Sequence, residues 1–174
     1  MCDRPTETED MRKFVHMVAP LGLQPYNREQ SRNVALVLSN ALDYTNVGQL
    51  FQEDAQDPQT AKDSLHLLEM MMLMLEQWVH SLNTEYEDEF MFGLVVSLLE
   101  VLVHAPAFWA RLKQSEVLTS MVIRVQDAER SPDSLLKRKC IAIMKAIASE
   151  RHSKVPDPVD RLRFRAKERT TPGG

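Results

Sequence analysis

The amino-acid sequence predicts an all-α protein, and the residue types of its long segments are the first reason. Leu, Met, Glu, Gln, Lys and Arg, which are good helix formers, fill these segments. The 174-residue chain has only 5 glycines, and the Asn-Gly and Asp-Gly pairs that favour tight β-hairpins do not occur in it. A chain of this length can form one domain with a sizeable core.

The spacing of apolar residues is the second reason, and it begins near the N-terminus. Thr6 and Glu9 form a capping box, so we expect a first helix to begin there. Pro20, Gly22 and Pro25 are expected to end it. A second helix is predicted over residues 28–44, with Asn27 as its N-cap. Apolar residues recur at helical spacing in both segments.

A short helix at 47–52 and an acidic loop at 53–59 are predicted to precede the longest helix, residues 60–83. Thr60 and Asp63 are expected to open it. This helix is apolar nearly all round, which predicts neighbours on several sides and a central place in the fold. Its apolar residues are Leu65, Leu67, Leu68, Met70, Met71, Met72, Leu73, Met74, Leu75, Trp78, Val79 and Leu82.

The next helix is expected to begin with a capping box at Thr84 and Glu87 and to extend to Ala105. Pro106 then breaks the helical pattern. The apolar residues at 108–112 predict a short helix or a tight turn.

Two helices are predicted in the remainder of the folded region. Ser115 begins one that reaches Glu129, on an apolar stripe at helical spacing. Ser131 is the predicted N-cap of the last helix, because Pro132 suits its first position. This helix is expected to end near Ser149.

Charge divides the chain into a helical domain, residues 1–150, and a basic flexible tail, residues 151–174. The tail has seven Lys/Arg and three Asp/Glu, a net charge of +4, whereas the domain has 14 and 22, a net charge of −8. The tail is also rich in proline and too poor in apolar residues to fold alone. A domain that binds nucleic acid through its folded face would have the opposite balance.

The two cysteines, Cys2 and Cys140, form neither a disulfide framework nor a CxxC metal pair. The N-terminus lacks the apolar stretch of a signal peptide. The longest apolar run, 90–103, is too short to span a membrane and contains Glu100. We therefore expect no membrane span and a cytoplasmic or nuclear location.

The segment Asn33-Val34-Ala35-Leu36-Val37-Leu38-Ser39-Asn40-Ala41-Leu42 resembles the third helix of an armadillo repeat, in which Leu-Ser-Asn is common. Similar segments recur at 96–102 and 141–147. The resemblance implies a short right-handed armadillo-like array of about three degenerate units over residues 28–150. HEAT repeats or an irregular helical bundle would produce much of the same pattern.

The same resemblance implies that Asn40 lines a groove and bonds the backbone of an extended peptide. An amide suits this task because it offers both a donor and an acceptor. Asn33 lies seven residues earlier on the same helix face. The alternative for Asn40 is a local bond to a carbonyl near the helix end.

Aromatic and acidic side chains supply further candidates for partner binding. Trp78 and Trp109 are candidate anchors for a partner helix, or else core residues. Glu85 and Glu89 belong to an acidic cluster that suits a basic peptide, although the dipole at a helix start also favours carboxylates there.

The segment 161–167 of the tail alternates basic residues with Leu162 and Phe164. It suits nucleic acid phosphates, an acidic membrane, an import receptor or the acidic domain itself, and the alternative is a solvated tail. Its basic residues are Arg161, Arg163, Arg165 and Lys167.

Motifs of catalysis and metal binding are missing from the sequence: it has no HExxH, P-loop, GxGxxG or GxSxG. We therefore expect a non-enzymatic adaptor without metal or cofactor, which binds a peptide segment or a partner helix and forms a possible homodimer. The alternative is a nucleic-acid-associated regulatory factor that uses the basic tail.

Overall fold

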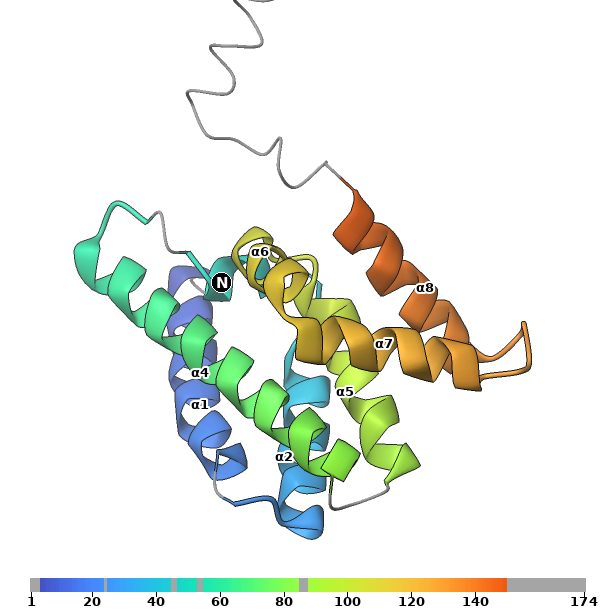
Figure 1. Cartoon of the computed structure of the whole chain (residues 1–174). Helices are drawn as coiled ribbons and strands as arrows, with labels where there is room; N and C mark the ends of the chain where they lie inside the picture. Colours follow the sequence, from blue (N-terminus) through green and yellow to red (C-terminus); the bar gives the residue numbers. More distant parts are fainter. Residues whose placement is uncertain (1–3, 24, 45–46, 53–54, 85–87, 150–174) are drawn as a thin grey trace, which may run out of the picture.

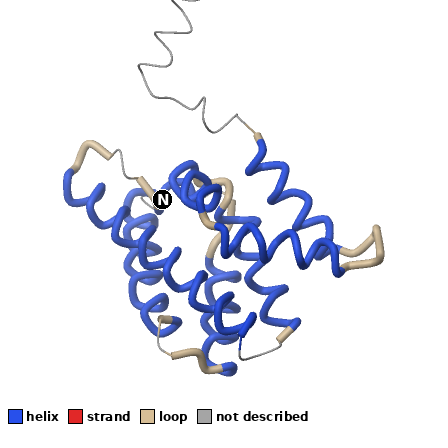
Figure 2. The backbone as a smooth tube through the Cα atoms, in the orientation of Figure 1, coloured by secondary structure: helices blue, strands red, loops and turns tan. Residues whose placement is uncertain are grey.

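The computed structural model describes residues 4–23, 25–44, 47–52, 55–84 and 88–149. Within these residues every regular element is a helix, which confirms the predicted all-α class (Figures 1 and 2). The eight helices of the described residues are α1 (Arg4–Gly22), α2 (Arg28–Ala41), α3 (Val47–Leu50), α4 (Pro58–Thr84), α5 (Glu89–Leu102), α6 (Pro106–Gln114), α7 (Glu116–Ala128) and α8 (Leu135–Ala148).

The long helices form two layers. In the first layer α4 lies between α1 and α7, and in the second layer α5 lies between α2 and α8 (Figure 1). Consecutive long helices pack across the layers as the pairs α1/α2, α4/α5 and α7/α8. The short helices α3 and α6 each precede one such pair, so the order short, long, long occurs twice.

Within the second layer, α2 and α5 run in the same direction. Near their starts, Arg32 donates to the carboxylate of Asp88 at 2.8 Å. Near their ends, the hydroxyl of Tyr44 donates to Glu100 at 2.6 Å. Each pair joins residues 56 apart in the sequence.

Within the first layer, α1 and α4 are parallel in the same way. His16 stacks on His66 with ring centroids 5.5 Å apart. Towards the ends of both helices, the indole N–H of Trp78 donates to the carbonyl of Gly22 at 2.9 Å. The histidines are 50 residues apart in the sequence, and Trp78 and Gly22 are 56 apart.

Residues that join the second and third helix pairs are fewer positions apart in the sequence, in both layers. Arg124 of α7 donates to Asn83 of α4, 41 residues away. Lys139 of α8 donates to Ser97 of α5, 42 residues away. Contacts between the first and second helix pairs thus join residues 50 or 56 apart, and contacts between the second and third join residues 41 or 42 apart.

The central position predicted for the longest helix is confirmed. α4 packs against α1, α5, α6 and α7. The side chains that it contributes to the core are Leu67, Leu68, Met71, Met72, Met74, Leu75, Trp78, Val79 and Leu82. Hydrophobic burial over three helix pairs therefore centres on one element.

Two predicted N-caps are confirmed. The side chain of Asn27 accepts from the backbone N–H of Gln30 at 3.0 Å at the start of α2. The hydroxyl of Ser115 accepts from the backbone N–H of Leu118 at 3.3 Å at the start of α7. Each side chain satisfies a backbone donor that has no partner within its own helix.

The predicted starts of α4 and α5 are wrong. Asp57, and not Thr60, caps α4: its carboxylate accepts from the backbone N–H of Thr60 at 3.1 Å, and Pro58 takes the first helical position. Thr84 cannot open α5, because it is the last residue of α4. Asp88 caps α5 instead, while Glu87 of the predicted capping box lies outside the described residues.

The last predicted start is also displaced. Ser134, and not Ser131, caps α8, because residues 131–134 form a turn closed by the backbone N–H of Ser134 on the carbonyl of Ser131 at 3.2 Å. At the other end of the chain, α1 begins at Arg4, two residues before the predicted start at Thr6. It ends at Gly22, one of the three predicted breakers, and Pro20 lies inside it. α2 ends at Ala41, and so Tyr44 lies beyond it.

Candidate functional site

The outer face of α2 carries both asparagines that the sequence singled out. Asn33 and Asn40 are exposed. The opposite face of this helix supplies its core contacts, and the buried residues are Ser31, Val34, Ala35 and Leu38. Both amides therefore point away from the core, from one side of the layer that α2 forms with α5 and α8. We call the exposed side of these three helices the outer face.

At the centre of the outer face, α5 contributes small and polar groups. A Cβ added to Gly93 would meet no heavy atom within 4 Å. One turn later, the hydroxyl of Ser97 donates to the carbonyl of Gly93 at 3.0 Å and accepts from Lys139 at 2.9 Å. The middle helix therefore leaves space over its backbone beside groups that form hydrogen bonds.

A charged cluster closes one end of the outer face. Asp88 is 3% exposed, and its carboxylate accepts hydrogen bonds from Arg28 at 3.2 Å and from Arg32 at 2.8 Å. The hydrogen bond from Arg32 is the main reason that the pKa of Asp88 is lowered, and the bond from Met91 adds to this against the opposing effect of burial. Arg32 also lies over the exposed ring of Phe90, 4.9 Å from its centroid.

A second polar contact closes the other end. The hydrogen bond from Tyr44 to the carboxylate of Glu100 raises the pKa of Tyr44 to about 12, and burial and the negative charge of Glu100 add to the shift. The ring of His104 meets the ring of Tyr44 edge-on, with centroids 4.8 Å apart. Helices α2 and α5 are thus joined near both ends of the outer face.

The two tryptophans lie in the core. Trp78 is 1% exposed and donates to Gly22, the last residue of α1. Trp109 is 6% exposed and donates to the carbonyl of Ala146 at 2.6 Å, in the last turn of α8. Each indole donates to a carbonyl in the last turn of a helix, where carbonyls lack the donor of a following turn. The carbonyl of Ala146 also accepts from the backbone N–H of Ser149 at 3.2 Å. Neither ring is exposed enough to anchor a partner, and we retain the core interpretation for both.

The remaining predicted residues are only partly placed. Glu89 is exposed in the first turn of α5, where the helix dipole favours a carboxylate. Glu85 lies outside the described residues, as do the boundary at 150/151 and the basic tail residues Arg161, Arg163, Arg165 and Lys167.

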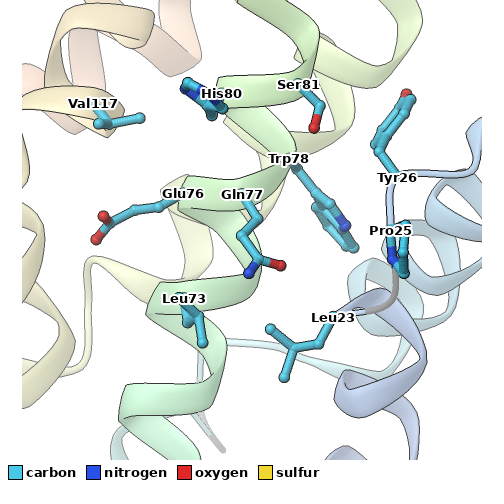
Figure 3. A pocket seen from close by; sticks show the side chains of 10 residues that line it. All are labelled: Leu23, Pro25, Tyr26, Leu73, Glu76, Gln77, Trp78, His80, Ser81 and Val117. Carbon is cyan, nitrogen blue, oxygen red and sulfur yellow. The ribbon is translucent and has the colours of Figure 1, made fainter.

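The sequence did not predict a groove that lies on the other layer, the layer of α1, α4 and α7. It follows α4 between the α1–α2 connection and α7, with a volume of about 540 Å³ (Figure 3). Leu73 of α4 and Val117 of α7 lie in it and are 52% and 38% exposed. Leu23 and Tyr26 line the side nearer α1. We call this the α4 groove.

Carboxylates flank the α4 groove where it meets α7. Glu76 and Val117 also line an adjoining hollow of about 420 Å³, whose wall includes Glu69 and Glu116. Glu69 pairs with Arg111. Among the described residues, Glu76 and Glu116 have no ion-pair partner. The groove thus has an apolar floor and two unneutralised carboxylates at its rim.

The free side of α1 and α2, at the start of the array, is apolar as well. Phe14 and Leu21 of α1 and Val37 of α2 line a hollow of about 590 Å³, and Asn33 lies at its edge.

Comparisons with protein-family models, with curated proteins and with solved structures find no match to this chain. In the described ranges, no three His, Cys, Asp or Glu side chains are grouped so that they could hold a metal ion. No described helix has the length and apolar character needed to cross a membrane.

Proposed function

We propose that this chain is a non-enzymatic interaction adaptor with a short right-handed armadillo-like array, and that it binds an extended peptide segment on its outer face. One observation supports this most directly. The three related segments 33–42, 96–102 and 141–147 fall on α2, α5 and α8, the helices that lie side by side in one layer. Similar residue steps in the two layers also favour a repeated unit.

An extended peptide needs partners for its backbone, because it forms no hydrogen bonds within itself. Asn33 and Asn40 each offer a donor and an acceptor on the outer face of α2. Gly93 allows the peptide backbone to approach α5 closely. The peptide would cross the three parallel helices, between the Asp88 cluster and the Tyr44–Glu100 contact.

Peptide selection tests this proposal. A displayed library of random peptides is selected on the full chain, and fluorescence anisotropy measures the affinity of a recovered peptide. We expect Asn40→Ala to raise the Kd about 5- to 15-fold, the effect of about 1–1.5 kcal/mol of lost hydrogen bonding. Gly93→Gln, which places a long side chain over α5, should weaken binding at least as much.

Gln56→Ala is the control, because Gln56 is an exposed amide like Asn40 but lies outside the outer face. It should leave both the affinity and the melting temperature unchanged. If Asn40→Ala unfolds the domain while Gly93→Gln binds the peptide normally, the outer face is not the binding site.

A second candidate, a nucleic-acid-associated factor, is favoured by the charge of the C-terminal part. α8 carries four basic and no acidic residues, and the basic tail follows it. Replacing Arg161, Arg163 and Arg165 with Gln in the full chain would abolish RNA or DNA binding under this proposal. The same variant would leave binding on the outer face intact.

A further inference from the structure

The α4 groove matches the chemistry of one segment of this same chain. Its floor exposes Leu73 and Val117, and Glu76 and Glu116 lie at its rim. A ligand suited to it carries apolar side chains toward the floor and positive charges toward the rim.

The segment 161–167 has that pattern. In an extended conformation alternate side chains point to opposite sides, so Leu162 and Phe164 share one side and the basic residues share the other. Arginine has a long apolar stem, which lets its guanidinium turn back to a carboxylate at the rim. An extended segment of this length spans about 20 Å. The groove and the adjoining hollow together follow α4 from Glu69 to Ser81, roughly 18 Å.

Helix α6 joins the end of α8 to the acidic hollow beside the groove. Trp109 holds the carbonyl of Ala146 against α6, and Gln114 at the other end of α6 lines the acidic hollow. These two residues of α6 are about 8 Å apart along the helix axis. Residues 150–160 would have to cover the rest of the path, and an eleven-residue segment reaches about 36 Å when extended.

We propose that residues 161–167 bind in the α4 groove of the same chain, with Leu162 and Phe164 on its apolar floor and arginines at Glu76 and Glu116. This contact goes beyond the adaptor function, because the groove lies on the layer opposite the outer face. It leaves Asn33 and Asn40 accessible and covers Leu73, the most exposed of the large apolar side chains of α4.

Disulfide trapping in the full chain tests the contact. In a Cys2→Ser background, Gln77→Cys is combined with Phe164→Cys. The remaining Cys140 is buried, which raises the pKa of its thiol to about 11 and keeps it unreactive. In the matched control, Phe164→Cys is combined with Asn40→Cys. Asn40 is exposed, like Gln77, but it lies on the opposite layer.

At low protein concentration, we expect the groove pair to form a monomeric disulfide at least about tenfold faster than the control pair, because binding raises the local concentration of one thiol at the other. Glu76→Gln with Glu116→Gln, or high salt, should remove most of that advantage. Equal rates for the two pairs would overturn the proposal. A disulfide-linked dimer as the main product would overturn it as well, since the occupant would then be the tail of a second copy.

Discussion

The contact between α1 and α4 and the contact between α2 and α5 join neighbouring parallel helices by different chemistry. The first is close packing: a Cβ on Gly22 would lie 2.6 Å from the sulfur of Met74 and 2.7 Å from the Trp78 ring. The second includes polar contacts, of the buried Asp88 with Arg32 and of Glu100 with the exposed Tyr44.

This difference predicts unequal contributions of the two contacts to stability. Close packing around Trp78 tolerates few changes, because the lost contacts and the cavity both cost free energy. The polar contacts between α2 and α5 contribute less, because they replace hydrogen bonds that the same groups make to water in the unfolded chain. Arg28 and Tyr44 stay exposed, whereas Asp88 is buried.

The largest effect is expected at Trp78. Trp78→Ala should lower the free energy of unfolding by about 3–5 kcal/mol, through a cavity beside α1 and an unsatisfied carbonyl at Gly22. Urea denaturation followed by circular dichroism measures the loss. Trp78→Phe keeps most of the ring and should cost clearly less. A loss below about 1 kcal/mol for Trp78→Ala would show that packing does not dominate this contact.

A smaller effect is expected at Asp88. Asp88→Asn keeps an acceptor for the Met91 N–H but removes the charge that Arg32 and Arg28 meet, and it should cost about 1–2 kcal/mol at neutral pH. Since folding lowers the pKa of Asp88 below its ordinary 3.8, the advantage of wild type is full above that pH and is lost as the pH falls through the lowered pKa. Denaturation of both proteins at a series of pH values checks this, and an advantage that persists unchanged in acid would contradict it.

The smallest effect is expected at Glu100 and is seen as a titration. Glu100→Gln should lower the pKa of Tyr44 from about 12 toward the ordinary 10.0, because the charged acceptor that favours the neutral phenol is gone. The stability from this contact is present below pH 10 and is lost as the pH rises through the pKa of the folded state. Ultraviolet absorbance of tyrosinate measures the shift, and Tyr44→Phe identifies the signal. An unchanged pKa in the variant would mean that Glu100 does not hold the phenol.

Local chemistry determined much of the helical framework. Asn27 and Ser115 cap helices as predicted because an N-cap satisfies backbone groups two or three residues away. The central place of α4 followed from an apolar surface that no single neighbour covers. Asp57 and Thr60 are both residue types that cap helices, and they lie three positions apart. The sequence pattern predicted Thr60 as the cap, whereas the structure has Asp57.

Only the tertiary structure decided what the side chains of these helices do. Trp78 and Trp109 are of a residue type that often anchors a partner, but each donates a hydrogen bond to a carbonyl of a helix far away in the sequence. The Arg32–Asp88 pair and the α4 groove likewise depend on residues 40 or more positions apart. Helical periodicity reports which face of a segment is buried, whereas the neighbour that covers it is set by how the layers pack.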